Sequence, residues 1–159
     1  AYCQDNELSW FDWSQVEQQA DLLRFVQQLT RLRLRLDALN KDNEEMTLWQ
    51  LLHQPRIQWS GPHLNQPDIS NTSHSVALSV WGPKLVFHLI FNAYWEPLAF
   101  ELPTLSANQY TPWRRIIDTA LDAPQDFCVF DDAPLIGQPF YFANSRSVVM
   151  LASRHVTAT

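Results

Sequence analysis

The sequence predicts a mainly β fold: an antiparallel β-sandwich preceded by one long α-helix. Residues 57–159 contain seven short runs rich in Val, Ile, Leu and aromatic residues, separated by Pro, Gly, Asn and Asp, as is typical of short strands joined by turns. Residues 14–37 instead place apolar side chains three and four positions apart, which indicates an amphipathic helix. With 159 residues, 46% of them apolar, the chain is long enough to bury one core.

The helix is predicted to begin at Ser14 and to end near Asp37. Ser14 and Glu17 match a capping box, in which each side chain bonds a backbone N–H of the first turn. Arginines gather at the far end, where cations favour the helix dipole. The apolar stripe consists of Leu22, Phe25, Val26, Leu29, Leu32 and Leu36. The Arg and Leu alternation of residues 31–36 alone would suit a strand, but it continues the helical period without a turn.

Residues 39–56 are predicted to form a linker containing one short helix. Residues 40–45 are polar, Thr47–Gln50 match a second capping box, and Pro55 would end the helix that starts there. We therefore divide the chain into a helical part, 1–38, this linker, and a sandwich, 57–159.

The seven strands of the sandwich are predicted at residues 57–59, 74–81, 84–92, 98–102, 113–119, 140–143 and 147–152. The second strand alternates Val76, Leu78 and Val80 with small residues, which predicts that this apolar set is buried. The third strand is apolar throughout residues 85–91 apart from one histidine, so we expect it to be buried on both faces and to be the central strand. Its predicted buried residues, with their partners from the last strand, are Phe87, Leu89, Phe91, Val148 and Leu151.

Composition excludes several classes of function. The net charge of −6 does not supply the basic face that a nucleic acid requires, and no apolar run is long enough to cross a membrane. Cys3 and Cys128 are expected to be free thiols in a reducing compartment, so we expect a cytoplasmic protein. The histidines and cysteines have no metal-like spacing, and the three glycines are isolated, so we expect no metal and no cofactor. His88, within an apolar strand, is interpreted as a core histidine.

Seven segments carry recognisable motifs. The chain opens with Tyr2–Trp13, and the others are Ile57–Gly61, Gln66–Ser70, Ser73–Leu78, Phe91–Pro103, Trp113–Ala120 and Arg146–Leu151. In this order they resemble the glycogen-debranching and isoamylase-type glycosidases of the α-amylase clan. Ser60 and Ile69 depart from that family's Trp-His-Gly and Pro-Asp-Trp-Ser motifs, and Leu39-Asn40 stands where many relatives have His-Pro.

The resemblance implies that residues 1–38 are the last loop and helix of a (β/α)8 catalytic barrel, and that residues 57–159 are the C-terminal β-sandwich. It implies a parent enzyme that hydrolyses α-1,6 branch linkages in glycogen or a similar branched α-glucan. The remainder of the barrel would lie upstream and be a partner of this chain. Without it, we expect the apolar stripe of residues 22–36 to self-associate.

We assign no catalytic residue. Retaining glycoside hydrolysis needs two carboxyl groups facing one another at about 5 Å. Asp5 and Glu7 lie on a predicted loop, and Asp131 and Asp132 are adjacent in a Pro-rich turn, so neither pair suits that geometry. The resemblance places the catalytic carboxylates upstream, and the fragment alone is expected to be structural and inactive.

Candidate substrate-binding residues are Gln4, Asp5 and Asn6. The resemblance puts their loop at the C-terminal face of the barrel, where such barrels build their active sites. These side chains would either bind sugar hydroxyls or order the loop. Trp10 and Trp13 would stack on sugar or pack against the barrel.

Four further tryptophans leave the role of the sandwich open. They are Trp59, Trp81, Trp95 and Trp113, and they would form either a glucan-stacking surface or part of the core. Exposed, coplanar rings would favour a second function, that of a stand-alone carbohydrate-binding module. Buried rings without glucan binding would favour a plain interaction domain.

Overall fold

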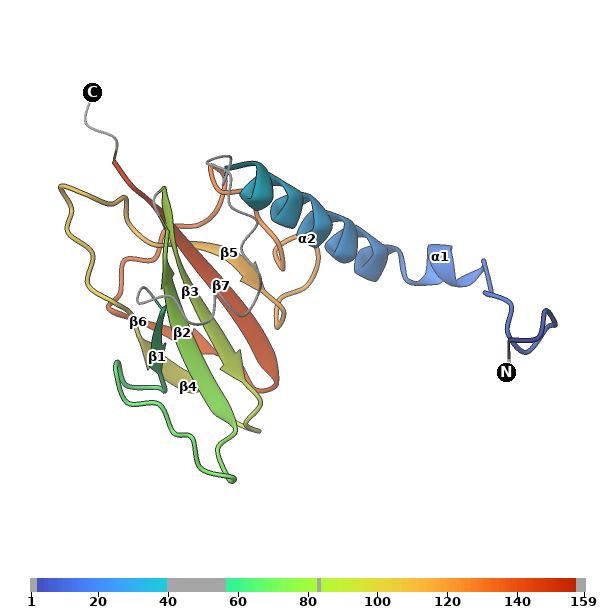
Figure 1. Cartoon of the computed structure of the whole chain (residues 1–159), viewed down its shortest axis with the longest axis horizontal. Helices are drawn as coiled ribbons and strands as arrows, with labels where there is room; N and C mark the ends of the chain where they lie inside the picture. Colours follow the sequence, from blue (N-terminus) through green and yellow to red (C-terminus); the bar gives the residue numbers. More distant parts are fainter. Residues whose placement is uncertain (1–2, 40–56, 83, 157–159) are drawn as a thin grey trace. The chain divides into compact units, whose positions relative to one another are not determined.

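A computed structural model describes residues 3–39, 57–82 and 84–156 of the chain (Figure 1). It divides into two compact units, residues 1–43 and 44–159. The predicted short helix from Thr47 to Pro55 lies outside the described residues, as does the linker beyond Leu39. The division at residues 38 and 56 stays a prediction.

The first unit contains two helices in its described part, α1 (Gln15–Gln18) and α2 (Ala20–Leu39). The prediction of a single helix from Ser14 was wrong in this respect, because the backbone leaves helical geometry at Gln19 (φ −111°, ψ 31°). The long helix that follows confirms a helix over most of the predicted range and extends two residues past Asp37.

The predicted capping box at Ser14 does not form. Ser14 has helical backbone angles and makes no side-chain cap bond, whereas an N-cap residue needs extended backbone geometry. Its N–H and its hydroxyl both donate to Asp12 Oδ1, at 3.0 and 2.7 Å. These bonds, the hydroxyl's first, lower the pKa of the Asp12 carboxyl. The hydroxyl keeps its acceptor lone pairs while it donates to Asp12, so the helical backbone geometry of Ser14 is what prevents the box.

Seven strands lie within the described residues of the second unit, each within two residues of its predicted bounds. The prediction of the strands is confirmed. They are β1 (Ile57–Ser60), β2 (Ser75–Trp81), β3 (Leu85–Asn92), β4 (Leu98–Glu101), β5 (Arg114–Asp118), β6 (Phe140–Ala143) and β7 (Ser147–Arg154).

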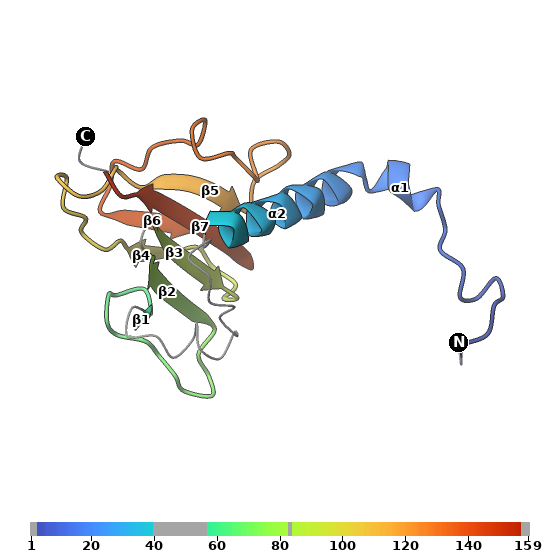
Figure 2. The same ribbon diagram turned by 45° about the horizontal axis from the view of Figure 1, so that its top comes forward.

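The strands form two antiparallel sheets, which confirms the β-sandwich (Figure 2). The larger sheet has the order β1-β2-β3-β7-β5, and β4 pairs with β6 in the smaller one. Strand β3 is therefore the central strand, as predicted. The register aligns Ala77, Ile90 and Val149 across β2, β3 and β7, so all three point to the same face of the larger sheet.

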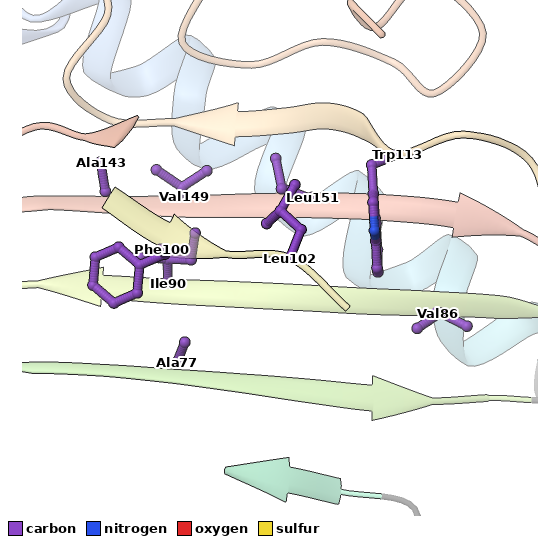
Figure 3. Packing of buried hydrophobic residues seen from close by; sticks show 9 residues of the cluster. All are labelled: Ala77, Val86, Ile90, Phe100, Leu102, Trp113, Ala143, Val149 and Leu151. Atoms are coloured by element: carbon purple, nitrogen blue, oxygen red, sulfur yellow. The ribbon is translucent and has the colours of Figure 1, made fainter. Parts of the chain in front are cut away.

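That face and the smaller sheet enclose the core of the sandwich (Figure 3). Phe100 of β4 and Ala143 of β6 contribute from the smaller sheet, and Trp113 precedes β5. The cluster consists of Ala77, Val86, Ile90, Phe100, Leu102, Trp113, Ala143, Val149 and Leu151.

The predicted burial of two apolar sets was wrong. Phe87 and Leu89 are only half-buried and Phe91 is exposed, while the alternate positions of β3 are buried. The same inversion occurs in β2, where Val76, Leu78 and Val80 are half-buried and the small residues between them face the core. Of the predicted partners from β7, Leu151 is buried as expected and Val148 is half-buried.

The inversion has a steric cause. Large side chains from outside the larger sheet, those of Phe100, Leu102 and Trp113, occupy the space between the layers. Little volume remains for the residues opposite them, so small or hydrogen-bonded residues, such as Ala77 and Ser79, suit that face best. In β2 most of the bulky residues therefore lie on the outer face of the sheet. Strand β3 has bulky residues on both faces, because Val86 and Ile90 are buried in the core.

Candidate functional site

The loop before α1 holds the three candidate substrate-binding residues, all exposed or half-exposed. Asn6 Oδ1 accepts the N–H of Leu8 at 3.1 Å, and Asp5 accepts the indole N–H of Trp10. Gln4 Oε1 accepts a weak bond of 3.4 Å from the Asn6 amide. These contacts support the loop-ordering role, and sugar binding by the same residues stays a prediction.

Asn92, from the Phe-Asn-Ala segment of the resemblance, is the most heavily bonded side chain of the sandwich that we describe. Its buried Nδ2 lies 3.0 Å from the carbonyl oxygen of Glu96, 3.1 Å from that of Ala143 and 2.9 Å from that of Asn144. Its Oδ1 accepts the N–H of Tyr94 at 3.0 Å. One side chain thus fixes the loop after β3 to the end of β6.

Asp118 and Thr119, from a second motif segment, also connect separate elements. Asp118 accepts the N–H of Ala120 at 3.0 Å and the hydroxyl of Tyr141 at 2.7 Å. Burial, and then this bond, raise the pKa of the Tyr141 hydroxyl. Thr119 Oγ1 accepts the N–H of Val148 at 2.9 Å. These motif residues therefore hold strands together in the structure, which is a structural role.

His88 is a core histidine, as interpreted from the sequence. It is 0% exposed, and its Nδ1 lies 2.9 Å from the hydroxyl oxygen of Ser79. Its Nε2 has no hydrogen-bond partner among the described residues. Burial lowers the pKa of the imidazole from 6.5 to about 4. A Ser–His pair enclosed in this way has no access to a substrate, so it is not a nucleophilic site.

The four tryptophans of the sandwich separate into two classes. Trp113 is 6% exposed, and its indole donates to the carbonyl oxygen of Pro103 at 3.0 Å. Trp81 packs half-buried against the core and lies edge-on to Tyr110. Trp59 on β1 is 44% exposed and Trp95 is 61% exposed. Two of the four therefore belong to the core or its margin, and a single glucan surface made of all four is wrong.

Trp95 belongs to an aromatic group that sequence reasoning missed. Its ring and that of Tyr94 have centroids 3.8 Å apart and planes 31° apart. The ring of His74, which immediately precedes β2, lies edge-on to both, at 6.0 Å from Trp95 and 6.3 Å from Tyr94. The consecutive aromatics between two predicted strands were an available signal, whereas the proximity of His74 depends on the strand register.

Two of the four carboxylates considered for catalysis, Asp5 and Asp131, have structural contacts. Asp131 pairs with Arg154 at 2.7 Å on the surface. No group of three or more His, Cys, Asp or Glu side chains gathers among the residues that the structure describes. Within the same residues, no helix is long and apolar enough to cross a membrane.

Comparison with known proteins identifies the sandwich. The family described as "Isoamylase 1-3, C-terminal" matches residues 58–153, which begins in β1 and ends in β7. The matched segment includes Asn92, Asp118 and the aromatic group around Trp95.

Individual relatives extend the similarity to the helical unit. The chain is 30% identical over 156 residues to isoamylase SU1, chloroplastic, of Zea mays, covering 95% of this chain and 18% of that protein. It is 32% identical over 134 residues to isoamylase 1, chloroplastic, of Oryza sativa subsp. japonica, covering 84% of this chain and 15% of the relative.

A bacterial relative is more similar over a shorter stretch. The glycogen debranching enzyme of Cronobacter sakazakii is 54% identical over 59 residues, 37% of this chain and 8% of the relative. The chain thus spans less than a fifth of the length of each of these relatives. Since the family match covers more than half of the residues, from the first strand to the last, this chain belongs to the isoamylase 1-3 C-terminal family.

Proposed function

We propose that this chain is the C-terminal portion of a debranching glycoside hydrolase that acts on α-1,6 branch linkages of glycogen or a similar branched α-glucan. The observation that carries the proposal is the family match over residues 58–153. Relatives named isoamylase and glycogen debranching enzyme align with this chain over a small part of their length. Residues 1–38 would complete a catalytic barrel, and residues 57–159 would be its C-terminal sandwich.

Within such an enzyme the polar motif residues of the sandwich would have a structural role. The polar groups of three motif residues, Asn92, Asp118 and Thr119, form hydrogen bonds between loops and strands. An asparagine or aspartate used in this way has little hydrogen-bonding capacity left for a substrate. The catalytic carboxylates would come from barrel loops upstream of Ala1.

We expect the isolated 159-residue chain to be unable to hydrolyse a branched glucan, because neither carboxylate pair considered from the sequence, Asp5 with Glu7 or Asp131 with Asp132, suits the facing geometry that hydrolysis needs. The measurement is the release of new reducing ends from glycogen, compared with buffer alone. The proposal fails if hydrolysis persists through repurification and is abolished by Asp5→Asn or Glu7→Gln, since the chain would then contain its own catalytic residues.

We also propose that the apolar stripe on α2 contacts the upstream barrel in the parent enzyme. Leu22, Val26 and Leu29 are exposed in this structure, and three large apolar side chains on one helical face favour burial against a partner. In the isolated chain, the available partner is a second copy. Self-association through residues 22–36 is the expected consequence.

Light scattering after gel filtration tests this contact. The mass of the chain should rise with concentration, and Val26→Glu should return it to that of a monomer because a charge in an apolar contact is costly. Gln27→Glu adds the same charge at the neighbouring, exposed position and should leave the mass unchanged. A monomer at every concentration would show that the stripe does not drive association.

Gln4, Asp5 and Asn6 are proposed to approach the substrate only in the intact barrel. The compartment is proposed to be the cytoplasm, supported by two free cysteines, Cys3 and Cys128, among the described residues. The two plant relatives are named as chloroplastic proteins.

A further inference from the structure

We propose that Trp95, supported by Tyr94 and His74, is a docking platform for a single chain of an α-glucan. This inference rests on the proposed function, because that function supplies the class of ligand. The site would hold the polymer on the sandwich.

The ring geometry suits one sugar residue. Tyr94 lies against one face of the Trp95 indole, with 3.8 Å between the ring centroids. Since Trp95 is nevertheless 61% exposed, its free surface is mainly the opposite face. An indole face is a flat apolar area of the size of a glucose ring, and the C–H groups on one face of glucose can pack against it. The edge of His74 would provide a ring nitrogen for a neighbouring hydroxyl.

The platform is rigid before any ligand binds. Asn92 fixes both ends of the segment, through the N–H of Tyr94 and the carbonyl oxygen of Glu96. The carbonyl oxygen of Tyr94 accepts the N–H of Arg146 at 3.2 Å, and Arg146 holds the left-handed φ of 53°, which few residues other than glycine adopt. The N–H of Ala93 donates to the carbonyl oxygen of His74 at 2.8 Å. A ligand would therefore bind without paying the entropic cost of ordering this loop.

The surroundings favour a neutral polymer over a charged one. The chain carries a net charge of −6, and Glu96, which directly follows Trp95 in the sequence, is exposed, so a polyanion would be repelled. A purely apolar partner would leave the polar groups of Glu96 and His74 without hydrogen bonds. A sugar satisfies both conditions, because one ring offers an apolar face and a rim of hydroxyls.

Trp59 provides a matched comparison within the same sandwich. It is also exposed, at 44%, but it projects from the edge strand β1, and no aromatic partner is described for it. If exposure alone were sufficient for binding, the two tryptophans would contribute equally. The proposal instead requires that binding depend on Trp95.

Native electrophoresis of the full 159-residue chain through gels with and without glycogen tests the platform. The acidic chain migrates toward the anode, and glycogen should slow it. Trp95→Ala should weaken the apparent affinity by at least about tenfold, equivalent to about 1.4 kcal/mol. Trp59→Ala should migrate like the wild type, and a gel containing a soluble β-linked glucan should retard none of the proteins.

Three results would contradict the proposal. In the first, glycogen does not retard the wild type; in the second, it retards Trp95→Ala and the wild type equally; in the third, the β-linked glucan retards the wild type as much as glycogen does. If Trp95→Ala does not fold, Trp95→Phe decides: weaker retention than wild type supports the platform, and equal retention overturns it. None of these results bears on whether the parent enzyme hydrolyses branches, so the proposed function is tested independently.

Discussion

Replacing Phe100 with alanine is expected to lower the free energy of unfolding of the sandwich by about 3–5 kcal/mol. Phe100 is 0% exposed and lies within the cluster that joins the two sheets (Figure 3). Its removal loses the transfer free energy of the ring and leaves a cavity, because close-packed neighbours relax only in part. Since a domain of this size has a total stability of about 5–15 kcal/mol, the variant should be close to unfolding at elevated temperature.

Phe142→Ala is the matched control for this experiment. Phe142 lies on β6, which pairs with the strand of Phe100, but it is 62% exposed. The same atoms are removed, so the difference between the two variants isolates burial. Urea denaturation followed by circular dichroism gives both free energies. If both variants lose the same free energy of unfolding, the assignment of Phe100 to the core and of Phe142 to the surface is contradicted.

The second expected effect is a loss of stability in mild acid caused by His88. Its pKa is about 4 in the folded chain and 6.5 in the unfolded reference. Below pH 6.5 the unfolded chain therefore binds a proton that the folded chain does not. The contribution of His88 to the free energy of unfolding is therefore fully present above pH 6.5 and is lost as the pH decreases toward 4. At pH 4 the free energy of unfolding should be about 3 kcal/mol lower than above pH 6.5.

A comparison of variants separates this effect from the titration of carboxylates. His88→Gln removes the titrating group, so its stability should fall less steeply between pH 6.5 and 4 than that of the wild type. His74→Gln changes an exposed histidine and should leave the steep fall in place. If wild type and His88→Gln have parallel stability curves over this interval, the buried imidazole does not determine the acid sensitivity.

Sequence patterns predicted the strands well because the information is local. Most runs of β-branched and aromatic residues end at or next to Pro, Gly, Asn or Asp, and both parts of that signal lie within a few residues. The buried face of β3 was not predictable in this way. The side chains on both faces of β3 are apolar or hydrogen-bonded. Which face is buried depends on Phe100 and Leu102, which belong to the opposite layer. Patterning loses its directional information when both faces are apolar.

The prediction that a helix begins at a capping box on Ser14 was wrong for a different reason. The capping-box pattern compares only the residue types of Ser14 and Glu17, whereas the box also needs an extended backbone at Ser14, and this residue has helical backbone angles. The aromatic site was predictable only in part. Tyr94 and Trp95 are adjacent in the sequence, but His74 reaches them through the pairing of β2 with β3, and Asn92 fixes the loop through residues 51 and 52 positions further along the chain.

The central claim is that this chain completes a debranching glycoside hydrolase. Sequencing the DNA upstream of the codon for Ala1 tests it most directly. The account predicts an open reading frame that continues upstream, in frame, through a (β/α)8 barrel with catalytic carboxylates on the loops that follow its strands. A start codon adjacent to Ala1, or an upstream domain of another fold, would contradict the account and favour a stand-alone module.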